Sequence, residues 1–148
     1  MRVQSVDIPP ELDRLEIVSH NGPNRVQIAD LDRWAAPLDE QIRTVLSEDL
    51  SARLPQGLVA APGEPATRDP RRLLSVDILE FYGDDRAGGC TIILRSDWTL
   101  RGAGAAARHG SERIQQPVAA GCAAAALPAA MSRALGELAD RLATAIGQ

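Results

Sequence analysis

Residues Gly102 to Ala107 (GAGAAA) carry the spacing in this chain that is most closely associated with nucleotide binding. They match the dinucleotide fingerprint in the form that ends on Ala, where glycines let the backbone approach a pyrophosphate. The fingerprint also needs an apolar strand before it and a helix after it. Here the preceding strand is half polar, and residues 108–113 show no helical apolar stripe. We therefore favour a plain connection, and we keep a cytosolic nucleotide- or small-ligand-binding domain that uses this loop as the alternative function.

Other reactive side chains show no spacing that is typical of catalysis. All 16 basic residues are arginine, so lysine chemistry such as Schiff-base formation is excluded. His20 and His109 fall in predicted loops without a Cys, His or carboxylate at ligand spacing, which argues against a zinc site. Four carboxylates lie near each other in the sequence but are interpreted as solvated turn and cap groups: Asp7, Asp13, Asp30 and Asp32. The sequence predicts no enzyme and no cofactor.

Two arginine pairs and one cysteine pair leave alternatives open. Arg71-Arg72 and Arg95/Arg101 have the charge to bind anionic headgroups, although an ordinary solvated sheet face is the preferred interpretation. Cys90 and Cys122 match no metal-site spacing. They are interpreted as small buried apolar residues, and a disulfide is the alternative in an oxidising compartment.

Composition limits the remaining function classes. The net charge is −4 and the pI is about 5.1, so a basic surface for nucleic acid is not expected. No run of about 18 apolar residues occurs that could span a membrane. Met1 and Arg2 lead directly into a strand-like segment, so no signal peptide is visible in this chain. With 148 residues, the length predicts a single domain over 1–148.

Hydrophobic periodicity predicts the elements that would position these residues. Alternating patterns predict strands. The predicted strands are residues 3–8, 15–19, 25–29, 58–61, 72–82, 91–101 and 111–118. Spacings of three and four predict two long amphipathic helices, one that follows Pro37 and ends near Leu54 and one from about Ala124 to Ile146. Pro37 is expected at the first helical position, where a missing N–H costs nothing. Cys90 and Cys122 precede the strand at 91–101 and the second helix, respectively.

This order predicts an α/β chain of the α+β type, with one mixed, mostly antiparallel sheet and two long amphipathic helices packed on it. One face of the sheet is expected to be buried and the other wet, because residues 91–101 alternate between apolar and polar side chains. The connection from the third strand through the first helix to residues 58–61 is expected to give one parallel pair.

The chain resembles the PqiC/YmbA family of auxiliary lipoproteins. The resemblance begins at an Asn-Arg strand followed by Trp34, Pro37 and Leu38, and it continues through Ile42 and Leu46 of the first helix. It extends to the strand that contains Leu94 and Trp98 and to the final helix with its Met131-Ser132 step. Trp34 is interpreted as a core residue that covers the start of the first helix, rather than as a residue that stacks on a ligand.

The resemblance implies a non-enzymatic subunit of an ABC/MCE-type lipid transport system that supports outer-membrane integrity. It implies a periplasmic domain, anchored to the outer membrane through an upstream lipidated Cys that is absent from this chain. The implied partner is an MCE-domain transporter protein, with a homo-oligomer and lipid contact as further possibilities. Docking is expected through the loops at residues 61–70 and 87–89 and through the sheet edges, while the helices remain structural.

Overall fold

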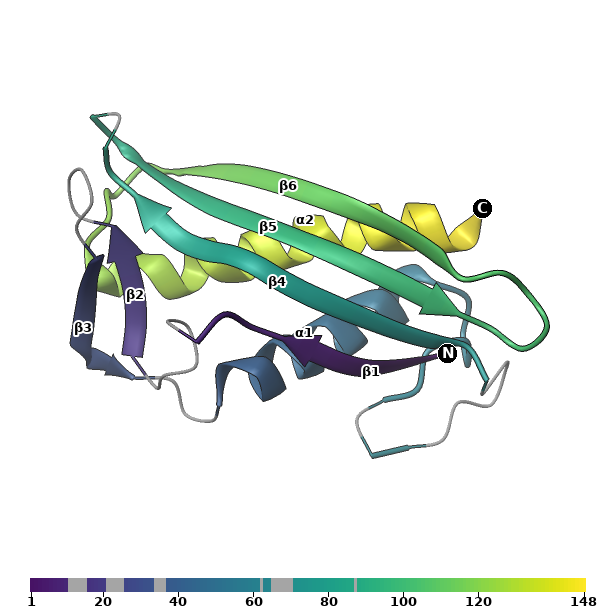
Figure 1. Ribbon diagram of the computed structural model, residues 1–148. Helices are drawn as coiled ribbons and strands as arrows, with labels where there is room; N and C mark the ends of the chain where they lie inside the picture. The colour runs from purple at the N-terminus through teal and green to yellow at the C-terminus, as the bar shows by residue number, and fades with distance from the viewer. Residues whose placement is uncertain (11–15, 21–25, 34–36, 62, 65–70, 87) are drawn as a thin grey trace.

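The computed structural model describes residues 1–10, 16–20, 26–33, 37–61, 63–64, 71–86 and 88–148. Its six strands form one mixed sheet in the order β3-β2-β4-β5-β6, with β1 beside β4 (Figure 1). The strands are β1 (Arg2–Asp7), β2 (Glu16–His20), β3 (Val26–Arg33), β4 (Leu73–Asp84), β5 (Cys90–Arg101) and β6 (Arg108–Val118). The helices are α1 (Leu38–Arg53) and α2 (Leu127–Gly147), the second preceded by a 3-10 turn, η1 (Ala124–Ala126). The predicted α+β class is confirmed.

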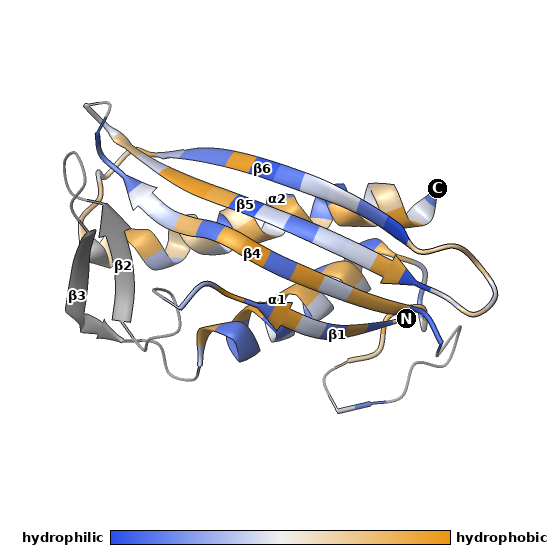
Figure 2. Cartoon of the chain, viewed as in Figure 1, coloured by the Kyte–Doolittle hydropathy of each residue, from blue (hydrophilic) through white to orange (hydrophobic). Residues whose placement is uncertain are grey.

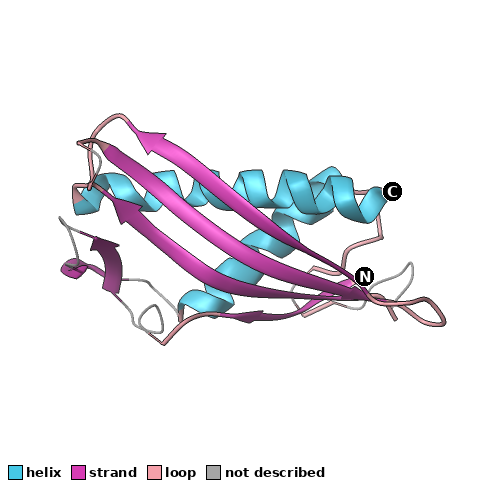
Figure 3. Ribbon diagram, turned by 45° about the horizontal axis from the view of Figure 1, so that its top comes forward, coloured by secondary structure: helices cyan, strands magenta, loops and turns pink. Residues whose placement is uncertain are grey.

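The central strands β4 and β5 divide the sheet into an apolar and a polar face. Along β5, Ile92, Leu94 and Trp98 are buried, whereas Arg95 and Asp97 between them are exposed. Figure 2 shows this alternation as changing colour along both strands. Both helices cover the apolar face, and the other face is open (Figure 3).

The helices form where the sequence places an apolar stripe. In α1, the buried apolar positions are Leu38, Ile42, Leu46 and Leu50. The longer stripe of α2 includes small residues such as Ala130 and Ala134, which allow close packing on the sheet. Pro128 lies in the first turn of α2, as expected.

Three predicted features of the first half are wrong in detail. Pro37 has a ψ of 137°, so it precedes the helix as its N-cap and Leu38 is the first helical residue. Residues 58–61 form no strand, because their backbone joins no ladder. It is held by turns and by two hydrogen bonds with Met1, from the Met1 amino group to the Leu58 carbonyl and from the Ala60 N–H to the Met1 carbonyl. The parallel pairs are instead β1 with β4 and β2 with β4.

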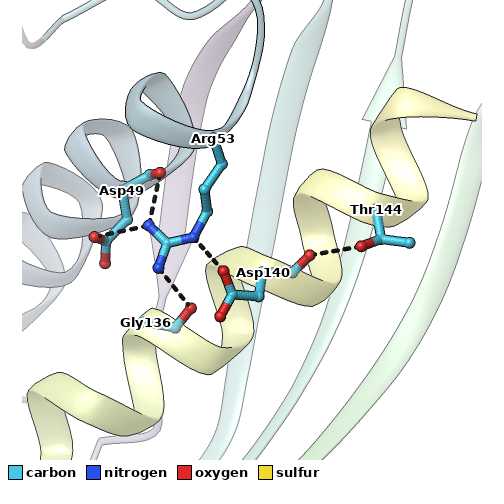
Figure 4. A network of polar contacts seen from close by, with 5 residues as sticks. All are labelled: Asp49, Arg53, Gly136, Asp140 and Thr144. Atoms are coloured by element: carbon cyan, nitrogen blue, oxygen red, sulfur yellow. Dashed lines mark hydrogen bonds and ion pairs between the residues drawn. The ribbon is translucent and has the colours of Figure 1, made fainter.

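A polar network joins the two helices on the outside of the core (Figure 4). The Arg53 guanidinium at the end of α1 donates to Asp49 Oδ1 at 3.1 Å and to the Gly136 carbonyl of α2 at 3.4 Å. It also donates to the carboxylate of Asp140. A Cβ at Gly136 would lie 3.8 Å from Arg53 Nη2, an ordinary van der Waals distance, so the network does not itself require glycine there. The network fixes the end of α1 against α2.

A disulfide between Cys90 and Cys122 ties the start of β5 to the segment before α2. The Cα atoms are 5.1 Å apart and the sequence separation is 32 residues. Gly83 of β4 lies beneath it, where a Cβ would be 3.2 Å from Cys122 Sγ and 2.9 Å from Leu127 Cδ2. The interpretation of two unpaired cysteines is therefore wrong, because strand β6 brings the chain back to within bonding distance.

Candidate functional site

Three carboxylates form a row across the centre of the open face of the sheet. Asp7 of β1 pairs in register with Asp77 of β4, which in turn pairs with Asp97 of β5. The row ends at Ser111 of β6, whose hydroxyl donates to Asp97 Oδ1 at 2.6 Å. We call Asp7, Asp77 and Asp97 the acidic row. Like charges directly opposite each other destabilise a sheet, so this row is not explained by stability.

Asp77, in the middle of the acidic row, has a raised pKa because of its neighbours and its partial burial. Partial desolvation raises the pKa of Asp77 above its ordinary value of 3.8, and the charge of Asp7 raises it further. A hydrogen bond with Asp7 and the charge of Asp97 act in the same direction. Within the described part of the chain, no arginine forms an ion pair with any of the three. The row therefore offers negative charge to an outside partner.

A β-bulge lies beside the acidic row, next to an apolar side chain that faces outward. The register between β4 and β5 shifts between Ile78 and Glu80, which makes Leu79 the extra residue. Leu79 is 40% exposed, the highest value for a large apolar side chain among the described residues. A shallow hollow of about 460 Å³ surrounds it, lined by Asp7, Ile8, Pro9, Asp77, Ile78, Leu79 and Asp97. The site thus combines one apolar contact with surrounding negative charge.

Replacing Asp77 with asparagine tests the repulsion in the acidic row. The folded state binds the Asp77 proton more tightly than the unfolded chain, so its contribution to stability falls as pH rises from 3.8 through the raised pKa. We expect Asp77→Asn to raise the free energy of unfolding at pH 7 by about 0.2–1 kcal/mol. The gain should vanish at pH 3, where both states are protonated. Urea denaturation at the two pH values measures it, with Glu48→Gln on the exposed face of α1 as the control. Equal stabilisation at both pH values would contradict the repulsion.

The residues singled out by sequence lie in the core rather than at this surface. Leu38, Ile42 and Leu46 of α1 and Leu94 and Trp98 of β5 are all buried in the shared apolar cluster. Pro37 is exposed at the start of α1, and Trp34 lies outside the described residues. The five core residues position the site through the packing of the sheet on the helices, and they do not line it.

The acidic row was missed by sequence reasoning, which interpreted Asp7 as a solvated turn group. Outward-facing positions in the predicted strands include all three aspartates. The missing information was the register, which joins residues 70 positions apart in the chain (Asp7 and Asp77). Alternation can place each carboxylate on the open face but cannot place them side by side.

The loop from Gly102 to Ala107 does not form a nucleotide site. It joins β5 to β6, which are antiparallel neighbours, so no helix begins where the pyrophosphate would bind. The structure therefore lacks the strand-to-helix turn that the dinucleotide fingerprint requires. Gly104 has a φ of +75°, a conformation that suits a hairpin loop.

Two of the four arginines considered for binding headgroups, Arg72 and Arg95, have partners within the chain. Arg72 donates to the Ile146 carbonyl at the end of α2 at 3.4 Å, and Arg95 forms an ion pair with Glu80 at 3.2 Å. In the part of the chain that the structure describes, no group of three or more His, Cys, Asp or Glu residues is arranged to hold a metal ion. No described helix is both long enough and apolar enough to cross a membrane.

Comparison with known proteins decides the family. Residues 1–143 match the family model described as the ABC-type transport auxiliary lipoprotein component. The chain belongs to this family. It is also 32% identical over 115 residues to the intermembrane transport lipoprotein PqiC of Escherichia coli K12 and to its counterpart in Shigella flexneri. The resemblance to the PqiC/YmbA family is therefore confirmed.

Two solved structures share the fold of this chain. A crystal structure of an uncharacterized protein superposes with a TM-score of 0.82 at 22% identity, covering 96% of this chain and 88% of that one. A protein of Xanthomonas campestris gives 0.77 at 17% identity, covering 96% and 80%. The match to PqiC covers 78% of this chain but 54% of the relative, so the chain spans about half the length of the curated relatives it matches.

Proposed function

We propose that this chain is a non-enzymatic auxiliary subunit of an ABC/MCE-type lipid transport system and supports outer-membrane integrity. The observation that carries the proposal is the family match over residues 1–143. The name of the relative PqiC, an intermembrane transport lipoprotein, supports it independently. In this role the folded domain acts by binding a transport partner, the MCE-domain protein, rather than by transforming a substrate.

The proposed location is the periplasm, with an outer-membrane anchor at a lipidated Cys that lies upstream of this domain. The disulfide between Cys90 and Cys122 supports this location, because such bonds persist in oxidising compartments including the bacterial periplasm. The curated relatives, described as lipoproteins, extend well beyond the matched part, which leaves length for an anchoring segment.

The proposed docking surface is the open face of the sheet around Leu79, extending to the edge strand β6. The apolar stripes of α1 and α2 are already packed in the core. The open face combines an exposed apolar side chain with the negative charge of the acidic row, a composition suited to a specific polar interface. Expected docking through loops 61–70 and 87–89 stays a prediction, since most of those residues lie outside the described part.

Site-specific photocrosslinking tests this function and this surface together. A photoreactive amino acid at Leu79 should crosslink to the purified periplasmic part of the MCE-domain protein. The same amino acid at the exposed Arg133 of α2 should give no crosslink. Crosslinks between copies of this chain at Leu79 would indicate a homo-oligomer and would overturn the open face as the partner surface. If neither variant crosslinks to the MCE-domain protein, and a pull-down also detects no binding, the proposed function is contradicted.

A further inference from the structure

A second hollow lies at the other end of β1, away from the acidic row. It is bordered by β1, by α1 and by the segment that follows α1, and its volume is about 290 Å³. Its lining is formed by Arg2, Val3, Arg43, Ser47, Ala60, Ala61, Gly63 and Glu64. This volume lies at the lower end of ligand pockets, which span roughly 300–1,000 Å³. The hollow fits a small ligand or one headgroup.

Local backbone structure holds the walls of this hollow together. The Ala60 N–H donates to the Met1 carbonyl at 2.9 Å, which draws the segment after α1 against the start of β1. Gly63 has a φ of +85°, and the Glu64 N–H donates to the Ala61 carbonyl at 3.0 Å, closing a turn at the rim. The hollow is therefore a built part of the fold, with walls from three separate segments.

The floor of the hollow is buried and its rim is charged. Val3, Ser47 and Ala60 are each less than one-tenth exposed. The Ser47 hydroxyl donates to the Arg43 carbonyl at 2.7 Å, which fixes it one helical turn from the arginine. Arg2 and Arg43 are exposed at the rim. Within the described residues, neither guanidinium has a hydrogen-bond or ion-pair partner, so its donors remain available to a ligand.

The charges around the hollow favour an anion. The lining carries two arginines and one carboxylate, Glu64, and neither arginine forms an ion pair with it in the part of the chain that the structure describes. A guanidinium binds phosphate oxygens through paired N–H groups, and this geometry is more specific than that of a point charge. We propose that this hollow binds a phosphate-type anion between Arg2 and Arg43, supplied either as free phosphate or as the headgroup of an anionic phospholipid.

The proposal goes beyond the docking function, because it needs no protein partner and uses a separate surface. Glu64 allows a test of the direction in which a change of charge alters anion affinity. Its carboxylate opposes a bound anion, so Glu64→Gln should tighten binding, whereas Arg43→Gln should weaken it by about tenfold or more. If binding depended only on the net charge of the chain, the same charge change at an exposed position elsewhere would have the same effect. Glu48→Gln and Arg133→Gln are the matched controls for this.

Two probes distinguish the two sources of the anion. Inorganic phosphate is titrated against the folded chain by NMR, following the backbone amides of residues 2, 43, 47 and 60 and the Arg43 side-chain Nε–H. Co-sedimentation is measured with vesicles of phosphatidylcholine alone and with added phosphatidylglycerol. The site is supported by saturable chemical-shift changes or by sedimentation that depends on phosphatidylglycerol. In either case Arg43→Gln should weaken the binding and Arg133→Gln should leave it unchanged.

Binding by phosphate alone would assign the free anion, and binding by vesicles alone would assign the headgroup. Absence of both signals would overturn the proposal. Equal loss of binding in Arg43→Gln and Arg133→Gln would also overturn it. The spectra of each variant without ligand establish that it is folded, so a loss of binding is not confused with unfolding.

Discussion

Removing the disulfide by Cys90→Ala and Cys122→Ala together is expected to lower the free energy of unfolding by about 3–4 kcal/mol. The bond closes a loop across a sequence separation of 32 residues, which includes strands β5 and β6. Loss of the bond gives the unfolded chain more conformations while most folded contacts remain. Such a change is a large part of the stability of an ordinary domain, about 5–15 kcal/mol.

Urea or guanidinium denaturation measures this effect in the purified chain. The wild-type protein in the presence of reductant serves as the matched comparison, because reductant breaks the bond without altering other side chains. Each single variant should be about as unstable as the double variant, since either substitution removes the whole bond. A double variant with the wild-type denaturation midpoint would show that the disulfide does not stabilise the fold.

The two ends of the disulfide show why pairing could not be predicted from the sequence. Cys90 is the first residue of β5, whose predicted start was residue 91, and Cys122 lies before the predicted second helix, so both elements were predicted from local patterns. Their separation in space depends on β6 running antiparallel along the full length of β5, from Cys90 opposite Val118 to Leu100 opposite Arg108. Local patterns do not contain this register, so the bond remained one of two alternatives.

The same distinction between local and long-range information explains which other predictions of the fold and the site were correct. Alternation along β5 and the stripes of α1 and α2 are local, and they correctly predicted which faces are buried. The run from Leu58 to Ala61 is also apolar, but its backbone bonds to Met1, one residue before β1, and forms no ladder with a described strand. The acidic row and the hollow beside Arg2 and Arg43 both join β1 to distant segments, so neither could be derived from spacing.

Trp98 and Gly110 form the pair for which we expect the second large effect. They lie directly opposite each other on β5 and β6, with the indole over the glycine. A Cβ added to Gly110 would be 2.7 Å from Trp98 Cζ2 and 2.8 Å from Cε2, closer than real Cβ contacts allow. Trp98 is 6% exposed, so its ring has little space into which it could move. The glycine is required here by close packing, since its φ is not in the left-handed region.

We expect Trp98→Ala to lower the free energy of unfolding by about 3–5 kcal/mol, as for other large buried aromatic residues. Gly110→Ala should cost about 1–3 kcal/mol through overpacking, although alanine alone would favour the strand by roughly 0.5–1 kcal/mol. The two changes should not add. In a chain that already carries Trp98→Leu, the branched side chain is shorter, so Gly110→Ala should become neutral or stabilising.

A double-mutant cycle of Trp98→Leu and Gly110→Ala measures this coupling by chemical denaturation. Gly89→Ala is the matched control, because a Cβ there meets no atom within 4 Å and its φ is not positive. Near-ultraviolet circular dichroism then reports whether the Trp98 ring has moved in Gly110→Ala. If Gly110→Ala destabilised both backgrounds equally, the contact with the indole would not be the reason for glycine at this position. A backbone constraint on β6, which lies at the edge of the sheet and contacts α2, would then be the physical cause.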